Sequence, residues 1–162
     1  MNSPVVRIEL KRADVSQLVK GDALLSACEF VKALGRWADP IWGLSIARRY
    51  PASAVLYQTG DTTDGLLFVL RGQLRLMARK GSDMVDVGTA GPGEVAGESE
   101  ALGGGTRMSS AIAQAASDVV EIPRNAVTGL MARCPDLKTY LETVKRKRAE
   151  SLDEMTDFMN RW

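Results

Sequence analysis

The chain has 162 residues, of which 45% are hydrophobic and 25% charged, and this composition predicts one globular domain with an appended element. The net charge of +1 excludes a general electrostatic attraction to nucleic acid or to an acidic partner. The sequence contains no histidine, so it lacks the most common metal ligand and the most common general base at neutral pH.

The first 49 residues predict a short strand followed by helices. "VVRIEL" at 5–10 alternates like a strand, and residues at helical spacing then predict a helix from about Ala23 to Leu34. Those residues are Leu24, Leu25, Cys28, Val31 and Leu34. Pro40 breaks this pattern, and "IWGLSIARR" at 41–49 predicts a second short helix.

From Val55 the period changes to short β-rich runs separated by Gly and Asp. The runs are "AVLY" (54–57), "LLFVL" (66–70), "QLRLMAR" (73–79), "MVDVGTA" (84–90), "EVAG" (94–97), "SSAIAQAA" (109–116) and "DVVEIP" (118–123). In the third run, Leu74, Leu76 and Ala78 alternate with Arg75, Met77 and Arg79, which predicts a strand with one buried face. Many short strands with glycine turns predict a small barrel, roll or sandwich.

After Pro123 the pattern becomes helical again. "PRNAVTGLMARC" (123–134) predicts one helix, and a longer one begins at Pro135. The long helix carries a seam of residues spaced by four and three, as in a coiled coil. The seam consists of Leu137, Leu141, Val144, Arg148, Ser151, Met155, Phe158 and Trp162.

The segment "PGEVAGESEALGGGTRMSS" (92–110) places an acid and a base at the two ends of a glycine run. Backbone N–H groups of such a loop can converge on an anion, and Arg107 would supply two parallel donors to phosphate oxygens. Glu98 suits the hydroxyl of a sugar attached to that phosphate. The alternative is an ordinary turn flanked by solvated charges. A Gly-Lys-Ser/Thr ending is absent, so a nucleoside-triphosphate loop is not supported.

Residues 50–123 resemble the cyclic nucleotide-binding domain of the catabolite activator protein, the protein kinase A regulatory subunit and cyclic-nucleotide-gated channels. The resemblance is carried by "YPASAVLYQTGDTTDGLLFVLRGQLRLM", "GPGEVAGE", Arg107 and "VVEIPR". It implies an α+β, mainly β fold: an antiparallel, jelly-roll-like β-roll (50–123) with N-terminal helices (1–49) and C-terminal helices (124–162).

In that family the Gly-Glu to Arg segment is a phosphate-binding cassette. The resemblance implies that Glu98 accepts from the ribose 2′-hydroxyl and that Arg107 pairs with the cyclic phosphate of cAMP or cGMP. The remaining ligand-binding residues that it implies are Gly97, Ser99, Glu100, Ala101, Met108 and Ser109, mainly through backbone N–H groups.

The cassette departs from the family pattern at several positions. Glu100 stands where a small residue normally lies next to the phosphate, and a side chain that pointed inward would repel the ligand. The alternative is that the side chain of Glu100 faces the solvent. Met108 stands where members of the family have a small or hydroxyl residue after the arginine. A threonine there often accompanies a preference for cyclic GMP in the family, so its absence favours cyclic AMP. Ala96 replaces the usual aromatic residue, and Thr106 the usual proline.

In regulators of the family the long C-terminal helix pairs with its twin and covers the purine. We therefore expect a homodimer through this helix, with Arg148 or Ser151 reaching the nucleobase. The alternative is a helix that packs only on its own roll. Acidic residues near the basic cluster 145–148 cancel most of its field, so we expect no direct binding to nucleic acid.

The sequence leads to a non-enzymatic cyclic nucleotide sensor that needs no cofactor or metal and acts on an unidentified downstream partner. One alternative is a degenerate fold that serves as an interaction module or binds a cyclic dinucleotide. Another is the sensory half of a DNA-binding regulator, whose helix-turn-helix would have to follow Trp162. No nucleophile–base pair supports an enzyme.

The cellular location of the protein and the oxidation state of its cysteines can also be predicted from the sequence. No apolar run has the length of a signal peptide or a membrane span, so we expect a cytoplasmic protein without membrane contact. Cys28 and Cys134 show no CxxC spacing, so we expect two reduced, buried thiols, with a disulfide as the alternative.

Overall fold

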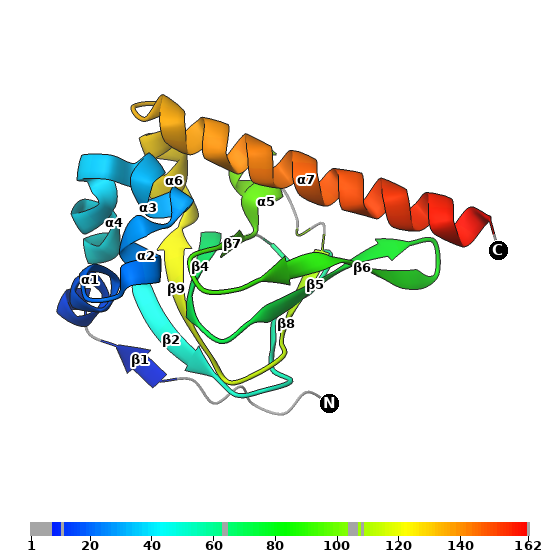
Figure 1. Cartoon of the computed structure of the whole chain (residues 1–162), viewed down its shortest axis with the longest axis horizontal. Coiled ribbons are helices and arrows are strands. Elements are labelled where there is room, and N and C mark those ends of the chain that lie inside the picture. Colours follow the sequence, from blue (N-terminus) through cyan, green and yellow to red (C-terminus); the bar gives the residue numbers. More distant parts are fainter. Residues whose placement is uncertain (1–7, 11, 63–64, 104–106, 108, 162) are drawn as a thin grey trace.

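The computed structural model describes residues 8–161 except 11, 63–64, 104–106 and 108 (Figure 1). The mainly β fold with flanking helices that the sequence predicts is confirmed. In chain order the elements are β1 (Ile8–Leu10), α1 (Arg12–Lys20), α2 (Ala23–Ala27), α3 (Glu29–Leu34), the 3-10 turn η1 (Gly35–Trp37), α4 (Ala38–Leu44), β2 (Ile46–Tyr50), β3 (Val55–Tyr57), β4 (Gly65–Arg71), β5 (Leu74–Lys80), β6 (Asp83–Ala90), β7 (Val95–Ala96), α5 (Glu98–Gly103), β8 (Ser109–Ala113), β9 (Ser117–Pro123), α6 (Arg124–Met131) and α7 (Pro135–Asn160).

Two antiparallel sheets form the roll. Their strand orders are β1-β2-β9-β4-β7 and β3-β8-β5-β6. β5 buries Leu74, Leu76 and Ala78 and exposes Arg75 and Arg79, so the predicted strand with one buried face is confirmed. β4 is buried at every position from 65 to 70 because both of its faces are covered.

The two faces of β4 belong to two hydrophobic clusters. Leu67 and Val69 point into the interior of the roll, whereas Phe68 faces the flanking helices. The ring centroid of Phe68 lies 5.0 Å from that of Phe30 in α3 and 5.3 Å from that of Trp42 in α4. These aromatic contacts hold the N-terminal helices against the outer sheet, and burial of such rings is a large part of the energy of a small core.

The N-terminal region differs from the sequence prediction in two places. The expected helix over 23–34 is broken at Cys28, whose extended backbone (ψ 156°) ends α2 before α3 begins. The expected helix over 41–49 was wrong in its second half, because Ile46–Tyr50 forms β2 and pairs with β9. Pairing with a buried neighbouring strand outweighs the weak local preference of this segment for a helix.

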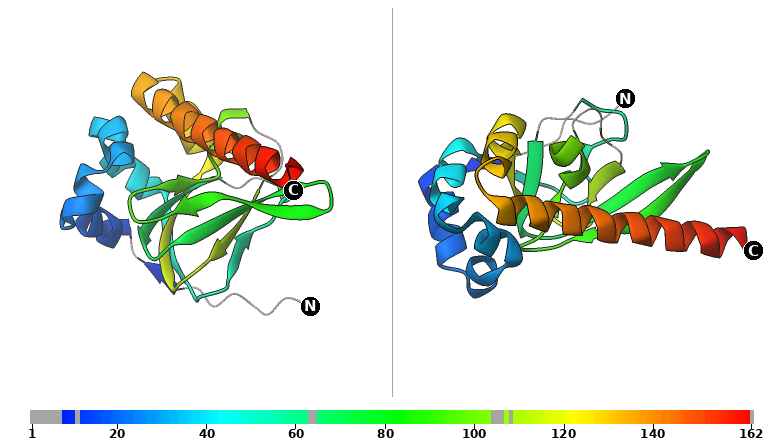
Figure 2. Two further views of the ribbon diagram at one scale, coloured as in Figure 1. Left: turned by 45° about the vertical axis from the view of Figure 1, so that its right-hand side comes forward. Right: turned by 90° about the horizontal axis from the view of Figure 1, so that it is seen from above.

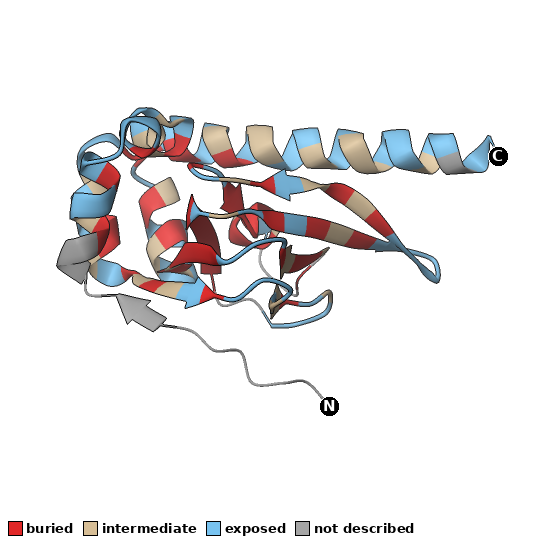
Figure 3. Cartoon of the chain, turned by 60° about the horizontal axis from the view of Figure 1, so that its bottom comes forward, coloured by how far each residue is buried: buried red, intermediate tan, exposed pale blue. Residues whose placement is uncertain are grey.

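The long helix α7 begins next to α6, passes α3 and α5, and continues alongside β6 (Figures 1 and 2). The predicted seam is used unevenly along its length. Leu137 and Leu141 are fully buried, whereas Met155 and Phe158 remain 38% and 58% exposed. Figure 3 shows the same change along the helix, from buried near its start to mostly exposed near its end. Trp162 lies outside the described residues.

Candidate cyclic nucleotide site

Gly97 and α5 form the turn that brings the cassette together. Gly97 has φ +88°, a backbone conformation that glycine adopts without strain. A Cβ atom at this position would lie 2.3 Å from Nη1 of Arg107. Glycine is therefore needed for the close approach of the arginine as well as for the turn.

Arg107 is held in a buried position by three kinds of contact. Its Nη2 donates to the carbonyl oxygen of Gly65 at 2.7 Å, and its guanidinium lies 4.2 Å from the ring centroid of Tyr57. Its backbone N–H donates to the Asp61 carbonyl, and its own carbonyl accepts from Gly60 N–H, both at 2.8 Å. Among the described residues, Nη1 of Arg107 has no hydrogen-bond partner. A buried donor of this kind is costly unless an acceptor reaches it.

Glu98, at the start of α5, is bound by the C-terminal helix. Nη1 of Arg148 donates to Glu98 Oε2 at 2.5 Å, and Nη2 donates to the Val95 carbonyl at 2.6 Å. Glu98 is buried and Arg148 half-buried. Arg148, which the sequence analysis expects to reach the nucleobase, is thus bound to the carboxylate of Glu98 in this structure.

Glu100 points into the protein from the first turn of α5 and is only 3% exposed. Its Oε2 lies 3.5 Å from Nη1 of Arg107, so the two side chains form a buried ion pair. The sequence left open whether this unusual glutamate faces the ligand or the solvent. It faces the arginine that the family resemblance assigns to the phosphate.

The other predicted site residues lie around this pair or on α7. Ser99 is half-buried, Ala101 packs into the core beneath the helices, and Ser109 begins β8. The hydroxyl of Ser151 donates to the Lys147 carbonyl at 3.1 Å, within α7. Met108 lies outside the described residues.

Three participants were not anticipated from the sequence. Tyr57 supplies the ring beneath Arg107, and Gly65 supplies a carbonyl that orients it. Leu152 of α7 packs against the interior cluster of the roll. Nothing in the local sequence signals these roles, because each depends on segments that are far apart in the chain.

Burial also affects the acid–base behaviour of Tyr57, whose ring lies against the guanidinium of Arg107. Desolvation, and then the negative charge of Glu98, raise the pKa of Tyr57 to about 12. Its hydroxyl therefore stays protonated under ordinary conditions, and the ring acts as a neutral support for the guanidinium.

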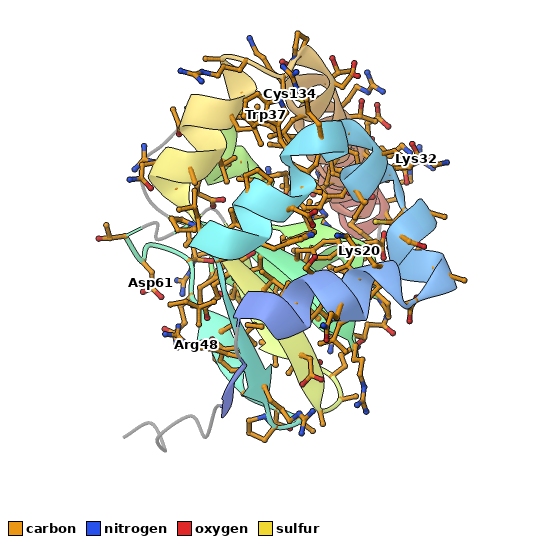
Figure 4. The ribbon with its side chains drawn as sticks, turned by 90° about the vertical axis from the view of Figure 1, so that its left-hand side faces the viewer. Lys20, Lys32, Trp37, Arg48, Asp61 and Cys134 are labelled. Carbon is orange, nitrogen blue, oxygen red and sulfur yellow. The ribbon has the colours of Figure 1, made fainter. Side chains whose placement is uncertain are left out.

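Two hollows border these residues. A groove of about 920 Å³ runs between α3, β6 and α7 and includes Arg148 and Ser151 in its lining. A smaller hollow of about 480 Å³ is lined by Arg107, Tyr57, Asp61 and Arg48 among others. Figure 4 shows Arg48 and Asp61 on one side of the molecule and Lys32, from the lining of the larger groove, on the other.

Cys28 and Cys134 are both free in the structure and form no disulfide with each other. The expected burial holds for Cys134, whereas Cys28 is only half-buried. Burial raises the pKa of the Cys28 thiol. In the part of the chain that the structure describes, no group of Cys, Asp and Glu is arranged to hold a metal ion. None of the helices described there is both long and apolar enough to cross a membrane.

The comparisons with known proteins agree with this fold. Residues 47–134 match the family model of the cyclic nucleotide-binding domain, which is more than half of the chain. The chain therefore belongs to the cyclic nucleotide-binding domain family.

Two relatives illustrate the range of proteins that contain this domain. The cyclic AMP receptor protein of Thermus thermophilus is 27% identical over 114 residues, which are 70% of this chain and 53% of the receptor. Lysophospholipase nte1 of Aspergillus fumigatus is 29% identical over 104 residues, 64% of this chain. These residues are 7% of the lysophospholipase, so the chain spans only part of both relatives.

A solved structure is similar to this chain over most of its length. The catabolite activator protein of Thermus thermophilus has a TM-score of 0.66 and 25% sequence identity to this chain. The match covers 82% of this chain and 63% of the activator protein.

Proposed function

We propose that the chain is a non-enzymatic sensor that binds a cyclic nucleotide, cAMP in preference to cGMP, in the cassette formed by Glu98, α5 and Arg107. The observation that carries this proposal is the buried Nη1 of Arg107, which lacks a hydrogen-bond acceptor among the described residues. A phosphate oxygen is the acceptor that fits a buried guanidinium next to backbone N–H groups. Glu98, at the start of the same short helix, is suited to the ribose hydroxyl.

The output of the sensor would pass through α7. Arg148 ties this helix to Glu98, the carboxylate that would accept from the ribose. A ligand that changes the hydrogen bonding of Glu98 therefore changes the balance between two positions of α7, and this population shift would signal to an attached domain or a partner protein.

The proposal is tested by isothermal titration calorimetry of the protein with cAMP and with cGMP. We expect binding of cAMP, and a loss of at least about 2 kcal/mol in binding free energy for Arg107→Ala, because a charge-assisted hydrogen bond is removed. Arg146→Ala, on the exposed face of α7, is the control and should bind like the wild type. Absence of heat with both nucleotides would refute the proposal.

We further propose that α7 pairs with its twin in a homodimer. Met155 and Phe158 support this, since they continue the seam of α7 and are exposed in the single chain. Sedimentation equilibrium should show a dimer that Phe158→Glu dissociates, because a charge would then be buried in the interface. A monomer at all concentrations would refute the pairing.

A second candidate is an interaction module that binds no cyclic phosphate. The ion pair between Glu100 and Arg107 favours it, because an acidic side chain already neutralises the arginine. The same titration separates the two candidates, since this module would give no heat with cAMP or cGMP.

A further inference from the structure

The carboxylate of Glu100 is the feature of the cassette that a phosphate-binding site does not need. It lies in the first turn of α5 and faces Arg107, the residue that the proposed function assigns to the phosphate. Its Oε2 is 3.5 Å from Nη1 of Arg107, and both side chains are almost fully buried, at 3% and 5% exposure. Two opposite charges in a poorly solvated site interact strongly at this distance.

The carboxylate of Glu100 neutralises the charge of the Arg107 guanidinium but makes no hydrogen bond with its Nη1. Nη1 of Arg107 is close enough to Glu100 for an ion pair, yet it makes no hydrogen bond within the described part of the chain. A buried guanidinium requires a counter-charge, which explains why the carboxylate turns inward. A phosphate oxygen on Nη1 would provide both the charge and the missing hydrogen bond.

The charges of the cassette show what binding would require. The pairs Glu98–Arg148 and Glu100–Arg107 each sum to zero, so the four side chains are already balanced. A cyclic phosphate adds one negative charge. If all four side chains stayed in place, that charge would be buried without compensation, at high cost. If the carboxylate of Glu100 left the site, the phosphate would restore the balance.

We propose that Glu100 is an internal competitor for the phosphate, which holds Arg107 in the unbound cassette and has to be displaced by a cyclic nucleotide. The inference rests on the proposed function and adds a specificity-determining residue to it. Glu100 lowers the affinity for anionic ligands and leaves the affinity for the uncharged nucleoside unchanged. The cassette therefore responds only to a nucleotide concentration high enough to displace its own carboxylate.

The first test uses inorganic phosphate and thermal unfolding, and it does not depend on nucleotide binding. Glu100→Ala and Glu100→Gln remove the competing charge, while Glu154→Gln makes the same charge change at an exposed position of α7. Phosphate should raise the unfolding midpoint of the two Glu100 variants more than that of the wild type or the Glu154→Gln control. The additional substitution Arg107→Gln should abolish this gain. Equal shifts in all the proteins would overturn the proposal.

The second test is calorimetric titration of the same proteins with cAMP and adenosine. Both Glu100 variants should bind cAMP roughly tenfold or more tightly than the wild type, because a close charge pair no longer competes. Adenosine, which has no phosphate, should bind all the proteins alike. Unchanged cAMP affinity, or equal gains for cAMP and adenosine, would overturn the proposal. Glu100→Gln keeps the size of the side chain and decides the matter if Glu100→Ala does not fold.

The two tests also separate this inference from the proposed function. If wild type and variants bind cAMP equally well, the sensor remains and Glu100 is not a competitor. If none of them binds cAMP but phosphate stabilises only the Glu100 variants, the competition is real and the ligand is not a cyclic nucleotide.

Discussion

The hydrogen bonds of Arg148 determine how firmly α7 is attached to the cassette, and their strength can be measured. Arg148→Met removes the donors to Glu98 and to the Val95 carbonyl but keeps much of the apolar stem. A hydrogen bond with a charged partner contributes about 1.5–3 kcal/mol. The side chains of Arg148 and Glu98 are only 16% and 6% exposed, so solvent screening is weak. We expect the free energy of unfolding to fall by about 3–5 kcal/mol.

A double-mutant cycle with Glu98→Gln isolates the pair from the bond to Val95. Urea unfolding of the wild type, both single variants and the double variant should give a coupling energy of about 1.5–3 kcal/mol. Arg146→Met is the matched control, because Arg146 is 67% exposed and lies 3.8 Å from Glu150. Its removal should cost less than about 0.5 kcal/mol. A coupling energy below about 0.5 kcal/mol between Glu98 and Arg148 would refute the reasoning.

Two further predictions concern Gly97 and Tyr57, which both lie close to the side chain of Arg107. Gly97→Ala should lower the cAMP affinity roughly tenfold or more in calorimetry, since the new Cβ would meet Arg107 at 2.3 Å. Gly103→Ala, whose Cβ would meet nothing within 4 Å, should leave the affinity unchanged, and equal affinities for both variants would contradict the prediction. Burial, and then the negative charge of Glu98, raise the pKa of Tyr57 from 10.0 to about 12. As the pH rises, the unfolded chain therefore loses the hydroxyl proton of Tyr57 before the folded protein does. The contribution of this proton to stability is complete below pH 10 and is lost as the pH rises through 12. Tyr57→Phe should therefore reduce the fall in the free energy of unfolding between pH 10 and 12, measured by urea unfolding. An equal fall in the wild type and the variant would contradict the prediction.

Much of the roll could be predicted from the sequence because its signals are local. The alternation in Leu74–Lys80 and the glycine turns between the strands depend on residues a few positions apart, and the structure forms strands there. The Gly-Glu to Arg segment could be recognised by its resemblance to the cyclic nucleotide-binding family, whose model matches residues 47–134. The strand at Ile46–Tyr50 could not, because the partner that stabilises it, β9, lies about seventy residues further along the chain.

The ion pairs that determine the chemistry of the site could not be predicted from the sequence either. Glu98 and Arg148 are fifty positions apart, and only the docking of α7 on the roll brings them together. The inward turn of Glu100 depends on the counter-charge of a buried arginine, and no local pattern encodes that requirement. Local periodicity thus predicts elements, whereas charge pairing between elements depends on the packing of the whole chain.

The packing of α7 suggests where a ligand-dependent movement would begin. Leu137 and Leu141 fix the start of the helix in the core, and most residues beyond Leu152 are exposed. Between these parts, Arg148 is bound to Glu98 and Leu152 packs against the interior of the roll. A ligand bound to Glu98, as proposed, would compete with Arg148, which lies one turn of α7 before Leu152. Once the bond to Glu98 is lost, the distal half of α7 is held by Leu152 and by its contacts with β6, whereas its first turns remain anchored by the buried Leu137 and Leu141.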